Sequence, residues 1–85
     1  MANYQLLFSR QAQKDIAELS PKQKTKLQKI LIEILAENPY QGKILKGSLV
    51  GLRSYRLNLK DRILYEIYES EKTILIIRAK SHYGD

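Results

Sequence analysis

The chain has 85 residues, the size of one domain, and we expect residues 1–85 to fold as a single unit. It has no cysteine and one histidine, which excludes a disulfide framework and a thiolate metal site. Fifteen Lys and Arg against nine Asp and Glu give a net charge of +6, which favours a polyanionic partner such as nucleic acid, the ribosome, an acidic protein or a membrane surface. The first residues show neither a signal-peptide pattern nor a transmembrane span, so we expect a cytoplasmic protein.

The first half of the chain is predicted to hold one strand and two helices. Residues 4–8 are a short apolar run, which is typical of a strand. Residues 9–19 have apolar residues at helical spacing, and Ser9 is a candidate N-cap. A second helix begins at Ser20, where a serine followed by a proline is a stronger start signal, and it ends before Pro39. The two helices should form a hairpin with one shared apolar side.

The second half of the chain is predicted to be β-structure. Residues 40–51 read as a basic loop that contains glycine, and after it polar and apolar residues alternate. Three strands are expected at 52–59, 62–68 and 73–80, joined by short polar turns. The predicted fold class is therefore α+β, with two N-terminal helices packed on one face of a twisted antiparallel four-stranded sheet. The predicted order of elements is one strand, two helices and three strands.

The turn between the second and third predicted strands decides which side chains share a face. A three-residue turn that pairs Leu59 with Ile63 puts the apolar residues of both strands on one side. The same register places Arg56, Asn58 and Arg62 together on the opposite side. A two-residue turn would mix the faces, so the pattern favours an odd number of loop residues and predicts a cationic face opposite the helices.

The residues that remain for chemistry are one histidine, several tyrosines and many cations. The sequence has no glycine-rich phosphate loop and no Ser-His-Asp set, and we expect neither a metal nor a cofactor. Cleavage of RNA without a metal needs one group to take the 2′-hydroxyl proton, one to protonate the leaving 5′-oxygen, and cations at the phosphate. His82 titrates in the right range, and Tyr83 can stack on an unpaired base. The phosphate-binding candidates are Arg56, Arg62, Lys43 and Lys46. The ordinary alternative is a solvated histidine, a packing tyrosine and plain surface charges.

Several stretches, taken in order, resemble the RelE/ParE superfamily of bacterial toxins, particularly its RelE and YoeB branches. The stretch "FSRQAQKDIAEL" (8–19) resembles the opening strand and first helix of the family. The stretch "AENPYQGKILKGSLVGLRSYRLNLKDRILYEIY" (36–68) resembles its middle part, which has an arginine-bearing strand before "RILY". The ending "AKSHYGD" (79–85) is similar to the His-Tyr ending of YoeB.

The resemblance implies a partner-controlled ribonuclease that cuts messenger RNA in the ribosomal A site by attack of the 2′-hydroxyl. It implies that Arg62 and Arg56 bind the scissile phosphate and that His82 is the general acid. Lys43 stands where YoeB-type enzymes have a glutamate base, and RelE-type enzymes manage with lysines, so either Lys43 or Lys46 would assist the base or the phosphate side. The expected RNA-contacting residues are Tyr83, Lys80, Arg53, Arg78 and Asn58.

The resemblance also implies partners. These are a cognate acidic antitoxin, the ribosome with its messenger RNA, and operator DNA bound through the antitoxin, with no membrane. The antitoxin is expected to place apolar side chains on the helical face or the sheet edge and to cover the cationic groove. Two other functions stay open: a ParE-like toxin that inhibits DNA gyrase without nuclease activity, and a non-catalytic basic module that binds RNA or protein.

Overall fold

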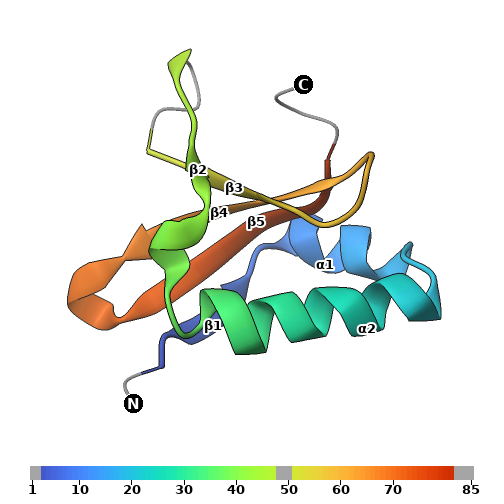
Figure 1. Cartoon of the computed structure of the whole chain (residues 1–85), viewed down its shortest axis with the longest axis horizontal. Coiled ribbons are helices and arrows are strands. Elements are labelled where there is room, and N and C mark those ends of the chain that lie inside the picture. The colour runs from blue at the N-terminus through green and yellow to red at the C-terminus, as the bar shows by residue number, and fades with distance from the viewer. Residues whose placement is uncertain (1–2, 48–50, 82–85) are drawn as a thin grey trace.

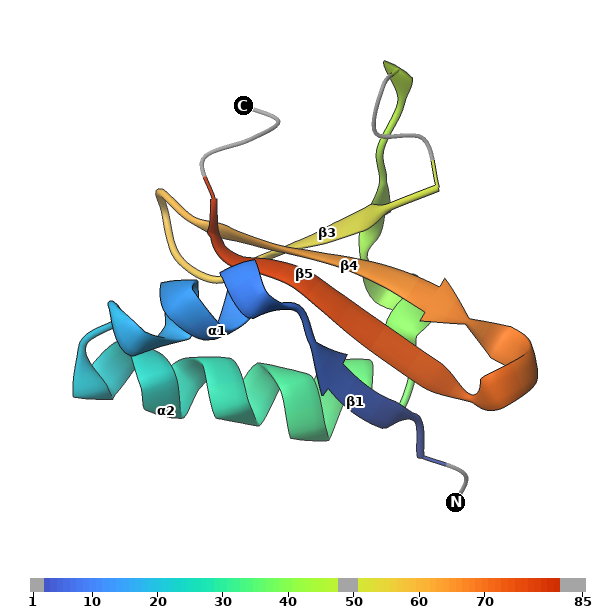
Figure 2. The same ribbon diagram turned by 180° about the vertical axis from the view of Figure 1, so that it is seen from behind.

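Five strands form one twisted sheet, and two helices cover one of its faces (Figures 1 and 2). The computed structural model describes residues 3–47 and 51–81. The strands are β1 (Gln5–Phe8), β2 (Lys43–Ile44), β3 (Arg53–Arg56), β4 (Arg62–Tyr68) and β5 (Thr73–Ser81), arranged in the order β1-β5-β4-β3-β2. The helices are α1 (Arg10–Ala17) and α2 (Pro21–Lys29), with α2 continuing as a π-helical segment, η1 (Ile30–Leu35). Two 3₁₀ turns, η2 (Pro39–Gln41) and η4 (Glu69–Glu71), lie in the connections.

Both helices start where their capping residues predict. The Ser9 hydroxyl accepts a hydrogen bond from the Ala12 N–H at 3.0 Å, and the Ser20 hydroxyl accepts one from the Gln23 N–H at 3.2 Å. Proline occupies the first turn of α2, where its missing N–H costs nothing. In the described part of the chain, no helix is long and apolar enough to cross a membrane.

The core lies between the helices and the inner face of the sheet. Apolar residues at helical spacing on α1, α2 and η1 meet alternate residues of the central strands β4 and β5. Each fully buried large side chain contributes about 1.5–3 kcal/mol relative to an exposed one. The largest fully buried side chains are Tyr65, Leu35, Leu57, Ile63, Ile74, Ile76 and Pro39.

The α+β class and the two-helix layer are confirmed, but the four-stranded antiparallel sheet is wrong in two respects. The segment predicted as a loop contains β2, a two-residue strand paired antiparallel with β3. Two residues are too short to show an alternating pattern. In addition, β1 is parallel to β5, because β5 reverses direction after its hairpin with β4 and returns beside the first strand. The predicted strand 52–59 ends at Arg56.

The predicted pairing of Leu59 with Ile63 is also wrong. Ile63 is opposite Tyr55, and Arg56 is opposite Arg62, so the loop holds residues 57–61. That loop has five residues, an odd number like the predicted three, so the alternation of faces is unchanged. Arg56 and Arg62 therefore share one face, as the alternation predicts.

Asn58 causes the longer loop. Its side-chain oxygen accepts hydrogen bonds from the backbone N–H groups of Lys60 and Asp61, both at 2.7 Å. The N–H of Leu57 donates to the carbonyl of Asp61 at 3.0 Å and closes the loop. An asparagine that bonds to the backbone two and three residues ahead builds a local turn and competes with strand pairing. As a result Leu59, predicted as a core residue, is 88% exposed.

The last part of β5 is flanked by β4 on one side and by α1, in place of β1, on the other. The pairing with β1 stops at Ile76, and α1 packs beside the rest of β5. There the buried carboxylate of Asp15 accepts hydrogen bonds from the Arg78 side chain at 2.7 Å and from the Ala79 N–H at 3.1 Å. Burial by itself raises the pKa of Asp15, but hydrogen bonds from Arg78, Gln11 and Ala79 together hold it below the ordinary value of 3.8.

Replacing Asp15 by Asn tests this connection. Because the folded-state pKa of Asp15 is lowered, its contribution is fully present above the ordinary value of 3.8 and is lost as pH falls through the folded pKa. We expect Asp15→Asn to lower the free energy of unfolding by about 1–3 kcal/mol at neutral pH, and the difference from the wild type to shrink in acid. Urea denaturation at several pH values measures both effects.

Glu18→Gln is the matched control for that experiment. Its carboxylate lies on the same side of the structure, 3.6 Å from Lys80, but its side chain is 69% exposed. We expect a change below about 0.5 kcal/mol. An equal effect of Asp15→Asn at neutral and acid pH would contradict the assignment.

Candidate active site

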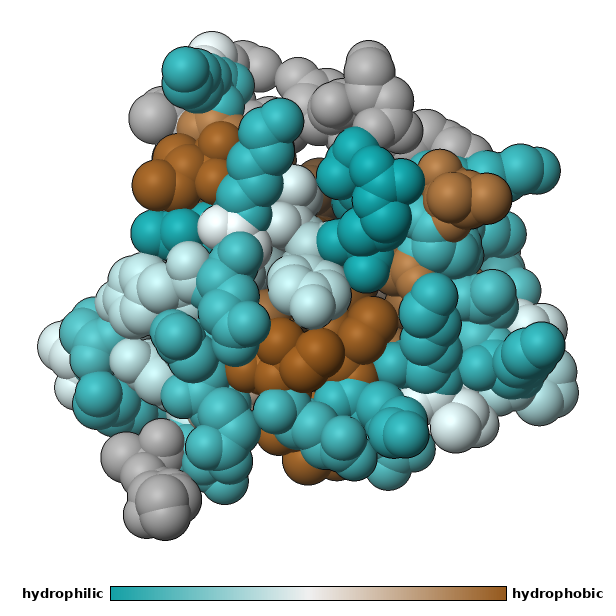
Figure 3. Space-filling model, in the orientation of Figure 1, coloured by the Kyte–Doolittle hydropathy of each residue, from teal (hydrophilic) through white to brown (hydrophobic). Residues whose placement is uncertain are grey.

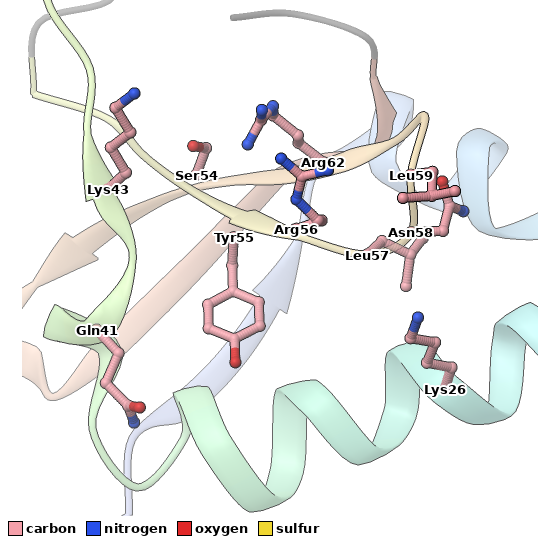
Figure 4. Close-up of a pocket in the computed structure, with 10 residues that line it drawn as sticks. All are labelled: Lys26, Gln41, Lys43, Ser54, Tyr55, Arg56, Leu57, Asn58, Leu59 and Arg62. Carbon is pink, nitrogen blue, oxygen red and sulfur yellow. The ribbon is translucent and has the colours of Figure 1, made fainter. Parts of the chain in front are cut away.

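A hollow of about 560 Å³ lies at the outer edge of β3, and basic side chains surround it (Figure 4). We call it the basic pocket. In the described part of the chain β2 pairs with β3 only at Arg53 and Ser54, so the backbone edge of Tyr55 and Arg56 faces this hollow. Its walls come from β2, β3, the turn to β4, the start of β4 and the helix α2. The lining residues are Lys26, Gln41, Lys43, Ser54, Tyr55, Arg56, Leu57, Asn58, Leu59 and Arg62.

Arg56 and Arg62 form the centre of the basic pocket. They are direct cross-strand partners, the last pair before the β3–β4 turn. Figure 4 shows their guanidinium groups on the same side of the sheet, whereas the Tyr55 ring points the other way, toward the helix. Like charges at directly opposed positions disfavour strand pairing. An anion placed between them would relieve the repulsion, and guanidinium groups suit phosphate because they offer several donors in one plane.

Two lysines extend the positive charge on either side of this pair. Lys43 is on β2, opposite Ser54, and its ammonium lies on the same side of the sheet as the arginines (Figure 4). Lys26 reaches the pocket from α2. Among the described residues that line the pocket, four are cationic and none is acidic. A concave surface of one charge sign concentrates oppositely charged ligands.

The surface around the basic pocket is not uniformly polar. Figure 3 shows an apolar area at the centre of this face, between β3 and α2, surrounded by hydrophilic side chains. The pocket itself includes apolar atoms of Tyr55, Leu57 and Leu59. The arrangement therefore suits an anion that also carries a flat, partly apolar group, as a nucleotide does.

The structure brings together four of the predicted site residues: Arg56, Arg62, Lys43 and Asn58 all line the basic pocket. Asn58 is at the same time part of the turn, since its amide nitrogen donates to the side chains of Gln23 at 3.2 Å and Asp61 at 3.3 Å. Its amide is thus largely occupied within the protein.

Other predicted site residues lie elsewhere. Arg53 donates to the carbonyls of Gly42 at 3.0 Å and Tyr40 at 3.3 Å, and its guanidinium lies 5.0 Å from the Tyr40 ring centroid. Arg78 is paired with Asp15 at the edge of β5.

Three further candidates remain. Lys80 lies 3.6 Å from Glu18, and Lys46 is exposed and does not line the pocket. His82 and Tyr83 lie outside the described residues.

Sequence reasoning missed Lys26, Gln41 and Tyr55 as pocket residues. Lys26 is one of several lysines on α2, and helical periodicity does not distinguish it from those that face solvent. Gln41 lies in η2, whose path across the sheet has no sequence signature. The described residues contain no group of three His, Cys, Asp or Glu side chains that could hold a metal ion.

A buried tyrosine supports the wall of the pocket that carries Lys43. Tyr65 on β4 is fully buried, and its hydroxyl donates to the carbonyl of Pro39 at 2.6 Å. Burial raises the pKa of Tyr65 to about 12, so the hydroxyl keeps its proton and remains a donor throughout the physiological range.

Comparison with solved structures finds the same fold in several toxins. The toxin–antitoxin complex RelBE2 from Mycobacterium tuberculosis contains a chain that is 27% identical, with a TM-score of 0.85; the match covers 96% of this chain and 95% of that one. The YoeB dimer from Staphylococcus aureus is 28% identical with a TM-score of 0.78, covering 96% of this chain and all of that one. The intact RelBE toxin–antitoxin complex from E. coli gives 26% identity and a TM-score of 0.74, covering 92% and 96%.

The family comparison covers almost the whole chain. No curated protein sequence gives a significant match. The family model described as the ParE toxin of type II toxin–antitoxin systems, parDE, matches residues 6–83. That range contains every element of the sheet except the first residue of β1, and it contains the whole basic pocket. The chain therefore belongs to the ParE toxin family of type II toxin–antitoxin systems, and it shares the fold of the RelE and YoeB toxins.

Proposed function

We propose that this toxin is an endoribonuclease that cuts messenger RNA in the ribosomal A site and so inhibits translation. The observation that carries the proposal is the direct pairing of Arg56 with Arg62 in a pocket that also holds Lys43. Concentrated positive charge of this kind suits the phosphate of a ribonucleotide better than a neutral ligand. The likeness to RelE and YoeB toxins supports the same activity.

The proposed reaction needs no group beyond the protein and the RNA. A base removes the proton of the 2′-hydroxyl, and the 2′-oxygen forms a bond to phosphorus. The bond from phosphorus to the 5′-oxygen breaks, and that oxygen takes a proton from an acid. The products are a 2′,3′-cyclic phosphate and a free 5′-hydroxyl. Arg56 and Arg62 stabilise the negative charge on the phosphate oxygens, with Lys43 or Lys46 assisting the phosphate or the base.

His82 is the proposed acid. Ser81, the residue before it, is the cross-strand partner of Arg62, so the chain continues into His82 from a position beside the basic pocket. Tyr83 is proposed to stack on a base of the bound RNA. The bonds from Asp15 to Arg78 and Ala79 fix the course of β5 three to four residues before His82.

The proposed partners follow from the charge of the chain and from its relatives. Two of the solved relatives are complexes with antitoxins, and a net charge of +6 suits an acidic one. We propose that a cognate antitoxin covers the basic pocket and that the joint complex binds operator DNA through the antitoxin. The ribosome would orient the message in the pocket, and such positioning can supply a large part of a rate enhancement.

Removing either central arginine should strongly slow cutting. We expect Arg62→Ala and Arg56→Ala each to lower the rate of message cleavage on programmed ribosomes about 100-fold or more, because each removes a charged donor at the phosphate. Mapping the cut ends by primer extension measures the rate and the position, and circular dichroism confirms that the variants are folded.

Arg10→Ala is the matched control for the arginine variants. It removes the same charge from an exposed position on α1, outside the basic pocket. Cleavage by this variant should stay close to that of the wild type. An equal loss in all three variants would mean that only the overall positive charge matters.

Replacing His82 separates the nuclease from other toxic activities. We expect His82→Ala to lose cleavage and growth inhibition while it keeps its fold, because His82 is the one histidine of the sequence and histidine is the usual proton donor near neutral pH. The same preparations should be tested for inhibition of DNA supercoiling by gyrase. A wild type that leaves messages intact but blocks supercoiling would refute the nuclease in favour of a gyrase inhibitor.

A further inference from the structure

The strand that carries Lys43 is too short to fix its own position. β2 has two residues, and an isolated pairing of that length has little stability in water. Both of its residues are exposed, so burial does not anchor it either. Its position therefore depends on the residues at either end of β2. Leu45, directly after it, is buried and bonds to Leu52. The residues before it, from Pro39 to Gly42, we call the crossing segment.

The hydroxyl of Tyr65 anchors the crossing segment from the core. It donates to the carbonyl of Pro39 at 2.6 Å, and both residues are fully buried. A buried carbonyl that loses a donor is less well compensated for its desolvation, so this bond favours one placement of the segment.

Gly42 shows how closely the crossing segment approaches that hydroxyl. Its backbone is extended, with φ −72° and ψ 158°, a conformation open to any residue. Space is the constraint, because a Cβ at this position would overlap the Tyr65 hydroxyl and lie 2.9 Å from the carbonyl oxygen of Ser54. The residue directly before Lys43 is therefore packed against the phenol and against β3.

Arg53 holds the crossing segment from the neighbouring strand. It is the cross-strand partner of Tyr65, and its guanidinium donates to the carbonyls of Gly42 at 3.0 Å and Tyr40 at 3.3 Å. Two side chains on neighbouring strands, Arg53 and Tyr65, thus donate hydrogen bonds to the crossing segment. Arg53 is half-buried, so water can partly replace the hydrogen bonds that it donates. The Tyr65 hydroxyl is buried, and water cannot replace its bond in the same way.

We propose that Tyr65 is a positioning residue: its hydroxyl fixes the crossing segment and thereby holds the Lys43 ammonium beside Arg56 and Arg62. The proposal rests on the proposed function for the nature of the ligand, messenger RNA. According to this proposal, Tyr65 influences cleavage through a single chain of contacts, which runs from its hydroxyl through Pro39 and Gly42 to Lys43. Tyr65 itself does not touch the reacting atoms.

Hydrogen exchange tests the anchoring without reference to any activity. The reporter is the Leu45 N–H, which bonds to the Leu52 carbonyl at 3.0 Å just beyond β2. The reference is the Ser9 N–H, which bonds to Ile76 at the opposite edge of the sheet at 3.0 Å. In Tyr65→Phe we expect exchange at Leu45 to rise about tenfold and exchange at Ser9 to stay the same.

Tyr68→Phe is the matched control. It removes a hydroxyl from the same strand, but that hydroxyl is bonded to Glu66 and does not contact the crossing segment. Exchange at both amides should match the wild type. An equal rise at Leu45 and Ser9 in Tyr65→Phe would mean that Tyr65 only stabilises the whole fold, and it would overturn the proposal.

A double-mutant cycle on programmed ribosomes tests the pathway to Lys43. We expect Tyr65→Phe to lower cleavage about tenfold in the wild-type background and to have no further effect in Lys43→Ala. In Arg56→Ala the same loss should persist, because Arg56 is not on the pathway. Additive losses in the Lys43→Ala background would overturn the proposal. A wild type that cuts no message would refute the proposed function. The hydrogen-exchange experiment would then be the test of whether Tyr65 positions the segment that carries Lys43.

Discussion

The pairing of β3 with β4 determines both the core and the basic pocket. Side chains alternate across each strand, so consecutive residues of a strand point to opposite faces of the sheet. Ile63 and Tyr65 fill the core from β4, and Arg56 and Arg62 meet on the outer side as a consequence. A shift of one residue would bury the arginines and expose the isoleucine. The hydrophobic effect, which acts on the inner face, therefore maintains a repulsive charge pair on the outer face.

Two buried polar groups fix the position of segments that the pairing of β3 with β4 does not reach. The carboxylate of Asp15 fixes the end of β5 beyond its pairing with β1, and the hydroxyl of Tyr65 fixes the crossing segment before β2. Both are on regular elements, and both bond to a backbone group of a segment distant in sequence. Irregular segments next to a ligand site need such anchors, because few apolar contacts restrain them.

The capping residues predicted the helix starts, and the alternation of apolar residues predicted the central strands and the shared face of Arg56 and Arg62. These features follow from capping and burial alone. The alternation could not predict the pairing of Ile63, because Asn58 lengthens the turn by binding backbone groups ahead of it. β2 spans a single period of the strand pattern, and its position depends on contacts with residues distant in sequence. The placement of Arg78 against Asp15 joins residues 63 positions apart, which no local pattern reveals.

The parallel pairing of β1 with β5 bears on how the protein is made. The Ser9 hydroxyl and the Ile77 carbonyl, at the end of this contact, are 68 positions apart in the chain. Helices can form early during synthesis, since their contacts are local, whereas this pairing has to wait until β5 has been translated. The central position of β5 delays the complete sheet until then. A nascent chain therefore has no complete sheet, and no finished pocket, before β5 has been made.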